Sequence, residues 1–204
     1  MNKPSKEDMR RVNELWEKDE KMEHHRREWD ELVKLLTNYK ENMNLNIDLN
    51  KIIQKISAID KTYRLGVRRH VGHYEYMAKR IIDVNFDTRV QNWDKSLIAD
   101  LCNSILFHKK PYSFMSVYCT LHNRLFYKRD DYVVNTGAIK NKLKKYQNEY
   151  PKYKFADFIE SDLKKVENYE KFKQILENFI DDFQLNCNLE DLDRYFWRMS
   201  KLGE

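Results

Sequence analysis

The histidines, cysteines and glycines of this chain decide which chemistries its sequence can support. Two of the six histidines, His70 and His73, stand three residues apart and could share a metal ion on one helix face, but no carboxylate or cysteine joins them at a ligand spacing. The three cysteines form no C-x-x-C pair, the four glycines build no phosphate-binding loop, and no nucleophilic serine motif is present. The sequence therefore predicts no metal and no cofactor, and it argues against nucleotide hydrolysis and dinucleotide chemistry.

One arrangement of residues does suit a reaction on DNA. A basic stretch, His108 to Tyr112 with Pro111 inside it, is predicted to form a short hairpin between two helices, and Asp130 follows 19 positions after Pro111. Free N–H groups at helix ends, with Lys109 and Lys110 beside them, favour binding to a phosphate of the DNA backbone. An aspartate in a cleft lined by aromatic side chains could support positive charge on a sugar, as cleavage of an N-glycosidic bond requires. The alternative is that Asp130 only caps a helix.

The charge of the chain is concentrated in its middle third. Residues 61–147 hold 17 basic and 7 acidic side chains, a net of +10, whereas the whole chain carries only +5. Aromatic residues are interleaved with these basic residues. This pattern favours a polyanion as partner, and the alternative is a solvated, lysine-rich surface.

Composition indicates the fold class. Only 4 glycines and 3 prolines occur in 204 residues, too few for the turns of a sheet protein, so the sequence predicts an all-α fold. The length suits one domain with an appendage. We expect a cytoplasmic protein with no membrane contact, because the chain starts without an apolar signal peptide and holds no run of about 18 apolar residues.

The first 44 residues are predicted to form a helical extension. Leu15, Met22, Trp29 and Leu36 recur every seven residues in a helix over 5–40, and an Asn-rich linker follows over 41–50. The helix either lies against its own domain or provides a contact for another protein. Residues 45–204 are predicted to form the main domain.

The main domain is predicted to consist of short helices that position the hairpin and Asp130. We expect helices over 49–59 (capped by Asp48), 67–83, 95–107 (capped by Asp94), 112–122, 138–148, 155–159, 167–183 and 189–200. The segment 123–129 is predicted to be irregular, with Asp130 or Asp131 opening the helix after it.

Four ordered segments resemble a known family. Residues 113–123 (SFMSVYCTLHN) and 126–133 (FYKRDDYV) are similar to S-F-A-S-K-Y-x-x-x-H-N and F-P-I-Y-D-S-Y-V of a bacterial helix-hairpin-helix DNA glycosylase-like family, related to 8-oxoguanine DNA glycosylases. Residues 56–82 and 179–197 resemble its upstream helix and its closing helices. The resemblance covers roughly residues 45–202 and implies a two-lobed helix-hairpin-helix glycosylase-like domain.

The resemblance also implies roles for individual residues. Asp130 falls on the family's catalytic acid, and Ser113 stands where related enzymes that also cut the backbone carry a Schiff-base lysine, so we expect a monofunctional glycosylase. The expected partner is double-stranded DNA with one nucleotide flipped out, and the base is damaged or belongs to modified phage DNA. The expected DNA-contacting residues are Arg64, Arg68, Arg69, Lys109, Lys110 and Lys128. The expected base pocket comprises Tyr63, His70, His73, Tyr74, Ser113 and Tyr118.

A second interpretation is a protein that keeps the glycosylase-like fold but does not excise a base. The family's Y-S-T is replaced here by Tyr63-Arg64-Leu65, and two acidic residues stand together at Asp130 and Asp131. These departures fit a non-catalytic helical protein that binds DNA or RNA.

Overall fold

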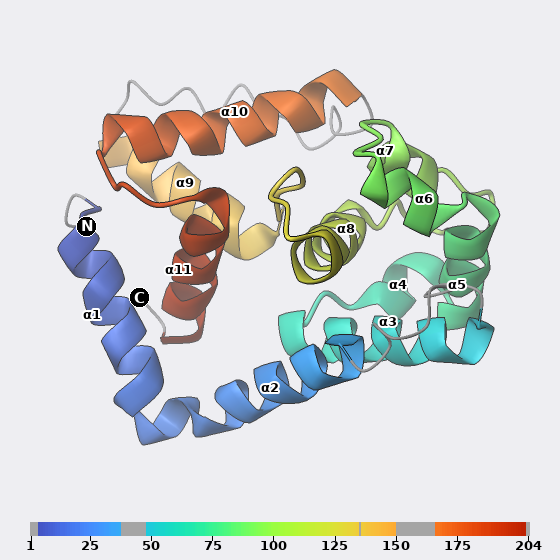
Figure 1. The fold of residues 1–204 in the computed structure, drawn as a ribbon, viewed down its shortest axis with the longest axis horizontal. Coiled ribbons are helices and arrows are strands. Elements are labelled where there is room, and N and C mark those ends of the chain that lie inside the picture. The colour runs from blue at the N-terminus through green and yellow to red at the C-terminus, as the bar shows by residue number, and fades with distance from the viewer. Residues whose placement is uncertain (1–3, 38–47, 135, 150–165, 203–204) are drawn as a thin grey trace. The chain divides into compact units, whose positions relative to one another are not determined.

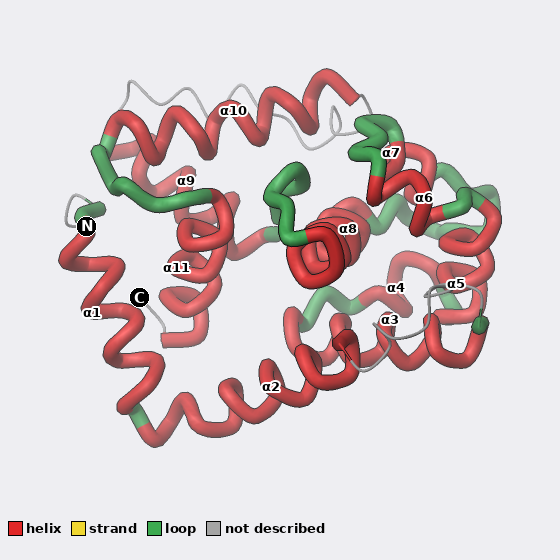
Figure 2. The backbone as a smooth tube through the Cα atoms, viewed as in Figure 1, coloured by secondary structure: helices red, strands yellow, loops and turns green. Residues whose placement is uncertain are grey.

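The computed structural model describes residues 4–37, 48–134, 136–149 and 166–202. Within these ranges the chain forms eleven α-helices, one short 3-10 helix and no strand, so the predicted all-α class is confirmed (Figure 2). No helix in these ranges is both long and apolar enough to cross a membrane. The chain divides into two units: unit 1 is Met1–His24 with Val133–Glu204, and unit 2 is His25–Tyr132.

Unit 1 joins the beginning of the chain to its end. It contains α1 (Lys6–Lys18), η1 (Glu20–Met22), α9 (Gly137–Glu149), α10 (Val166–Asp182) and α11 (Leu189–Leu202) (Figure 1). Ser5 caps α1 by accepting the Asp8 backbone N–H at 3.1 Å. Trp16 of α1 is buried, with its ring centroid 4.9 Å from that of Trp197 on α11. Helix α1 is therefore part of a hydrophobic core, which also contains the aromatic residues Tyr146, Phe179, Phe183 and Phe196.

Unit 2 is built around one buried helix. It contains α2 (Glu23–Thr37, whose first two residues precede the unit), α3 (Leu49–Tyr63), α4 (Val67–Val71), α5 (Tyr74–Asp83), α6 (Phe86–Gln91), α7 (Leu97–Cys102) and α8 (Tyr112–Tyr127). Every residue of α8 from Phe114 to Asn123 is buried, and α3, α6 and α7 pack against it. The helix is mostly apolar over this stretch, and a mostly apolar helix gains free energy when all of its faces are buried.

The predicted helix over 5–40 is interrupted. Asp19 takes an extended conformation (φ −73°, ψ 118°), and its side chain accepts the Lys21 backbone N–H at 2.9 Å, which ends α1 and opens η1. Residues 38–47 lie outside the described part of the chain. The predicted domain boundary at residue 44 falls there and stays a prediction.

Several predicted helix ends shift. Asp48 caps α3 as predicted, but α3 continues to Tyr63. The predicted helix over 67–83 is broken at Gly72, whose φ of 77° lies in a region that glycine adopts without strain. Asp94 accepts the Ser96 backbone N–H at 2.8 Å, but the helix that follows ends at Cys102 and not at residue 107.

The largest correction concerns α8 and the residues after it. The helix runs to Tyr127 and ends where Lys128 turns into the left-handed region (φ 55°), so the irregular segment predicted from residue 123 is wrong up to residue 127. Neither Asp130 nor Asp131 opens a helix, because the next helix begins at Gly137. The helices predicted over 138–148, 167–183 and 189–200 are confirmed within about two residues. The one over 155–159 lies outside the described residues.

Candidate nucleic-acid interface

Basic side chains from two distant segments meet on unit 2. The backbone N–H of Lys109, in the connector between α7 and α8, donates to the carbonyl of His70 on α4 at 3.0 Å. The pKa of His70 is lowered mainly by burial, and next by the nearby charges of Lys109 and Arg69. Arg68 and Arg69 are exposed on the same short helix. We call Arg68, Arg69, His70 and Lys109 the basic cluster.

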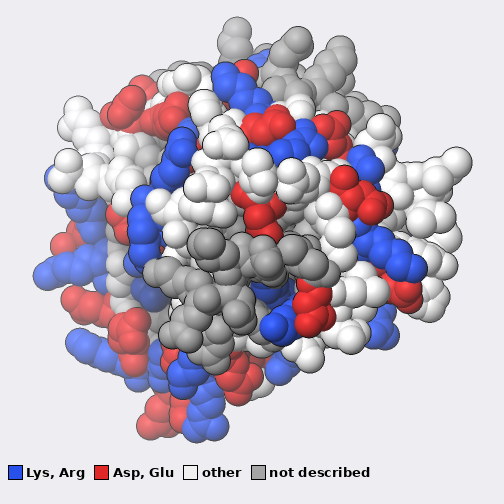
Figure 3. Space-filling model, turned by 45° about the vertical axis from the view of Figure 1, so that its right-hand side comes forward, with Lys and Arg blue, Asp and Glu red and all other residues white. Residues whose placement is uncertain are grey.

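Five acidic residues of unit 2 form ion pairs with basic residues outside the basic cluster. The ion pairs are Glu75 with Lys79, Asp94 and Asp100 with Arg89, Asp130 with Arg124, and Asp131 with Arg129. Within the described ranges no ion pair reaches Arg64, Arg68, Arg69, Lys109, Lys110 or Lys128. These six side chains therefore contribute to the excess positive charge of residues 61–147. Figure 3 shows Lys and Arg interspersed with Asp and Glu on the face it views, so the positive charge on that face forms no single continuous patch.

The position of α4 depends on Asp60. Both of its carboxylate oxygens accept the Val67 backbone N–H at 3.1 Å, and one of them accepts the Tyr74 hydroxyl at 2.7 Å. Burial, and then the hydrogen bond to Asp60, raises the pKa of Tyr74 to about 12. The Arg68 guanidinium lies 4.7 Å from the centre of the Tyr74 ring. Tyr74 therefore holds α4, α5 and Arg68 together, and its hydroxyl is committed to Asp60 rather than to a base.

The other residues of the predicted base pocket do not gather in one place. Tyr63 packs edge-on against Trp29 of α2, with ring centroids 6.3 Å apart. Tyr118 lies in the core at 0% exposure and stacks on His122 at 4.2 Å, so its burial does not support contact with a flipped base. Ser113 is half-buried in the first turn of α8, and His73 is exposed at the start of α5. Of the predicted base-pocket residues, His70 belongs to the basic cluster, and Tyr74 contacts the cluster through Arg68.

Asp130 lies in a loop that the end of α8 holds in place. Its carboxylate accepts a hydrogen bond from Nε of Arg124 at 2.8 Å; Asp130 is 29% exposed and Arg124 only 9%. The neighbouring Asp131 is held by Asn123, which is fully buried. The Asn123 Oδ1 accepts the Asp131 backbone N–H, and the Asn123 Nδ2 donates to the Asp131 carboxylate, both at 3.1 Å.

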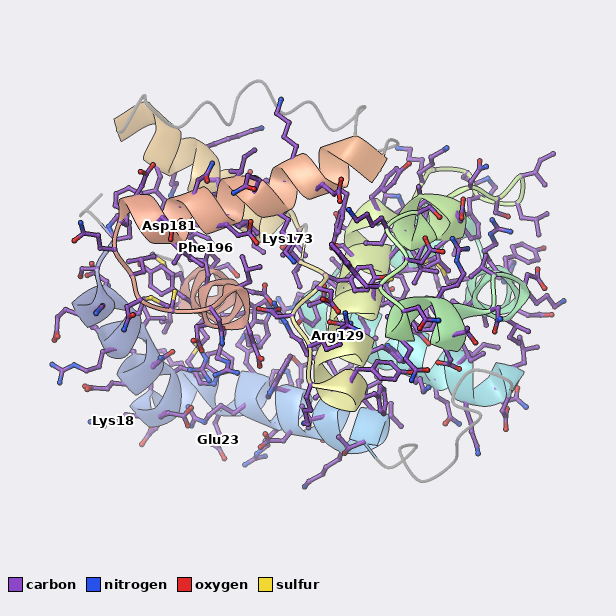
Figure 4. The ribbon with its side chains drawn as sticks, turned by 45° about the horizontal axis from the view of Figure 1, so that its top comes forward. Lys18, Glu23, Arg129, Lys173, Asp181 and Phe196 are labelled. Carbon is purple, nitrogen blue, oxygen red and sulfur yellow. The ribbon has the colours of Figure 1, made fainter. Side chains whose placement is uncertain are left out.

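Two further bonds anchor the loop to the helices beside it. The hydroxyl of Tyr132 donates to the carbonyl of Asp94 at 3.0 Å, and Nη1 of Arg129, labelled in Figure 4, donates to the carbonyl of Gln91 at 3.1 Å. The loop that carries Asp130 is thus tied to α8 and to the segment between α6 and α7. It presents a carboxylate whose charge is partly neutralised by Arg124.

The hairpin residues and Asp130 stand at opposite ends of α8. The helix has 16 residues, so its ends lie about 24 Å apart at 1.5 Å per residue. Lys109 and Lys110 precede its first turn, whereas Lys128 and Asp130 follow its last turn. The structure brings Arg68, Arg69, His70 and Lys109 together, but it does not bring Asp130 or Lys128 to them.

Sequence reasoning missed the residues that hold this architecture. The sequence predicts an irregular segment at Asn123 and Arg124, and the signal that could have revealed their role is the polar pair at the end of an apolar helix.

Two buried titratable residues of unit 2 were also not predicted. Lys55 of α3 is fully buried, and burial lowers its pKa to about 8. His122 is also buried, which lowers its pKa well below the usual value, and Lys55 lowers it further.

The described residues contain no group of three or more His, Cys, Asp or Glu side chains placed to hold a metal ion. No curated protein and no solved structure matches the chain. One family model, HI_0787_N, described as an N-terminal domain, matches residues 8–131. This match covers more than half of the chain and contains every residue of the predicted site. The chain therefore belongs to the HI_0787_N family.

Proposed function

We propose that this protein binds double-stranded DNA through the basic cluster, as a member of the helix-hairpin-helix glycosylase-like class. The observation that carries this proposal is the bond between Lys109 and His70, which places a lysine from the connector beside two exposed arginines of α4. No ion pair within the described residues reaches Arg68, Arg69 or Lys109, so their charges support binding to an anionic partner. The finer assignment to the glycosylase-like class rests on the resemblance over residues 45–202.

Binding through this cluster should depend steeply on salt. Each phosphate that a lysine or arginine neutralises releases counterions from duplex DNA, and the slope of log K against log salt is about −0.9 per phosphate. The double variant Lys109→Ala/Lys110→Ala should bind all sequences more weakly and flatten the slope by up to about 2.

The matched control for this experiment is Lys79→Ala/Lys95→Ala. It removes two exposed lysines of unit 2 that lie outside the cluster, and it should leave the slope nearly unchanged. Equal salt slopes for the parent protein and the Lys109/Lys110 variant would show that the connector does not contact the DNA phosphates. A duplex RNA of the same length, run in parallel, separates DNA from RNA as the preferred ligand.

Excision of a base is the second candidate function, and the rigid loop around Asp130 favours it. Arg124 holds the Asp130 carboxylate and Asn123 holds the adjacent Asp131, so little reorganisation is needed when positive charge develops on a sugar. In this reaction water adds to C1′, the N-glycosidic bond breaks, and the base leaves with a proton. Asp130 would stabilise the oxocarbenium-like transition state and orient the water. The pairing with Arg124 opposes this role, because it offsets the negative charge that the transition state needs.

Asp130→Asn separates catalysis from binding. The amide keeps the size of the side chain and its ability to accept from Arg124, but the negative charge is lost. We expect base release in a single turnover to fall by on the order of 10²-fold or more, with DNA affinity unchanged or higher. Asp83→Asn, an exposed position at the end of α5, is the control. A parent protein that binds duplex DNA but releases no base from any modified duplex would be a non-catalytic binder.

A further inference from the structure

The imidazole of His108 lies where the connector between α7 and α8 docks on α4. Its Nε2 is 3.3 Å from the position that a Cβ atom of Gly72 would occupy, so the missing side chain of Gly72 leaves room for the ring. The next residue, Lys109, donates its backbone N–H to the carbonyl of His70 at 3.0 Å. His108 is itself exposed, so it faces solvent from a place that these two contacts define.

Cations outnumber acids where the connector meets α4. The charged or titratable groups there are Asp60 of α3, Arg68, Arg69 and His70 of α4, His73 and Glu75 of α5, and Lys109 and Lys110 of the connector. Asp60 is committed to hydrogen bonds with α4 and α5, and Glu75 is paired with Lys79 at 2.6 Å. Within the described residues no ion pair reaches His108. An anion that enters the basic cluster would therefore give His108 a counterion that the described part of the chain does not supply.

The neighbouring His70 is held in its neutral form. Burial lowers its pKa most, and Lys109 and Arg69 lower it further, whereas Asp60 raises it. Its Nδ1 is buried and has no hydrogen-bond partner among the described residues, so a proton added there would form a buried N–H without an acceptor. His70 therefore serves as the anchor for the connector, and the exposed His108 is the histidine that a phosphate can reach.

From this placement we infer that His108 is a further phosphate contact of the basic cluster and takes up a proton when DNA binds. The inference rests on the proposed DNA binding and adds to it a dependence on pH. Histidine is the side chain whose charge changes between pH 5 and 8, whereas a phosphodiester stays anionic over this range. A phosphate oxygen beside the imidazole favours its protonated form, in which both ring nitrogens donate.

The sign of the pH dependence follows from linkage. A complex that holds one more proton than its separate components gains affinity as the pH falls, because the proton and the DNA favour each other's binding. An opposite charge at close range favours the protonated imidazole by about tenfold, so binding should be up to about tenfold tighter at pH 5.5 than at pH 8. Lysine and arginine contacts keep their charge across this range, so this effect is separate from the salt slope assigned to Lys109 and Lys110.

The test measures the Kd of the full chain for a dye-labelled duplex by fluorescence anisotropy, from pH 5.5 to pH 8 at constant ionic strength. His108→Gln keeps a polar side chain that cannot gain a proton, so it should match the parent protein at pH 8 and lose the gain at pH 5.5. His108→Arg carries a charge at every pH, so it should bind at pH 8 about as tightly as the parent protein binds at pH 5.5. His24→Gln, which replaces an exposed histidine outside the cluster, should follow the parent protein at every pH.

The outcomes separate the role of His108 from the proposed function. Binding that does not change with pH, or a pH dependence that survives in His108→Gln, overturns the inference while DNA binding stands. A pH dependence that His24→Gln reduces as much as His108→Gln does also overturns it, because the effect would then come from the overall charge of the protein. An absence of binding to any duplex at any of these pH values overturns the proposed function and the inference with it.

Discussion

Replacement of the buried Lys55 by methionine should stabilise this protein at neutral pH. Lys55 is 0% exposed on α3, and its pKa is about 8 in the folded chain. Burial is the main cause of this lowering; Asp87 raises the pKa and Lys51 lowers it a little further. Methionine keeps a long unbranched side chain that can fill the same space, but it carries no charge.

The magnitude follows from the difference in pKa between the folded and unfolded chains. A shift from the ordinary 10.5 to about 8 corresponds to about 3 kcal/mol against the charged amine at pH 7, at 1.36 kcal/mol per pKa unit. Between pH 8 and 10.5 the unfolded chain binds more protons than the folded chain, so this group makes stability rise with pH. At pH 9.5 about 1.4 kcal/mol of the penalty should remain.

Urea unfolding at pH 7 and pH 9.5 tests this reasoning. We expect Lys55→Met to be more stable than the parent protein by up to about 3 kcal/mol at pH 7, with the advantage shrinking by about 2 kcal/mol at pH 9.5. Lys79→Met is the control, because it removes an exposed lysine from a surface ion pair, and it should change stability by less than about 1 kcal/mol at either pH. A Lys55→Met protein that is less stable than its parent at pH 7, by the same amount at both pH values, would refute the reasoning.

Two other substitutions test the packing of the two units. Asn123→Ala removes both side-chain hydrogen bonds to Asp131 and leaves the Asp131 backbone N–H without that acceptor. The free energy of unfolding, measured with urea, should therefore fall by about 2–3 kcal/mol. The control Asn103→Ala changes an exposed position and should lower the free energy of unfolding by less than about 0.5 kcal/mol. Trp16→Ala should lower stability by about 3–5 kcal/mol because α1 is packed into unit 1; a loss below about 1 kcal/mol would instead indicate a weakly docked arm.

Local signals in the sequence predicted the helices well, and tertiary packing set their ends. The Asp48 cap and the apolar period over 167–183 are properties of neighbouring residues, so they could be recognised from the sequence. The break at Asp19 could not, because a continuous apolar stripe passes through it. The length of α8 was also hidden: its residues 114–123 are buried on all sides, and a helix without an amphipathic period gives no signal for where it stops.

The basic cluster was partly predictable for a similar reason. The excess of lysine and arginine over residues 61–147 can be counted from the sequence, but ion pairs decide which of those side chains keep an unengaged charge. Aspartates form ion pairs with Arg89, Arg124 and Arg129. No ion pair within the described residues reaches the cluster residues Arg68, Arg69 and Lys109. Such pairings join residues on different helices and loops, so composition alone could not assign them.

The continuation of α8 beyond His122 changes what Asp130 can do. A helix that ended at His122 would have let the chain fold back and bring Asp130 toward the connector at the other end. The last turn, from Asn123 to Tyr127, carries the chain about 7 Å further along the axis and then fixes the loop there through Asn123 and Arg124. A duplex held by Lys109 at one end of α8 must therefore extend along the helix, or be bent, before a sugar reaches Asp130.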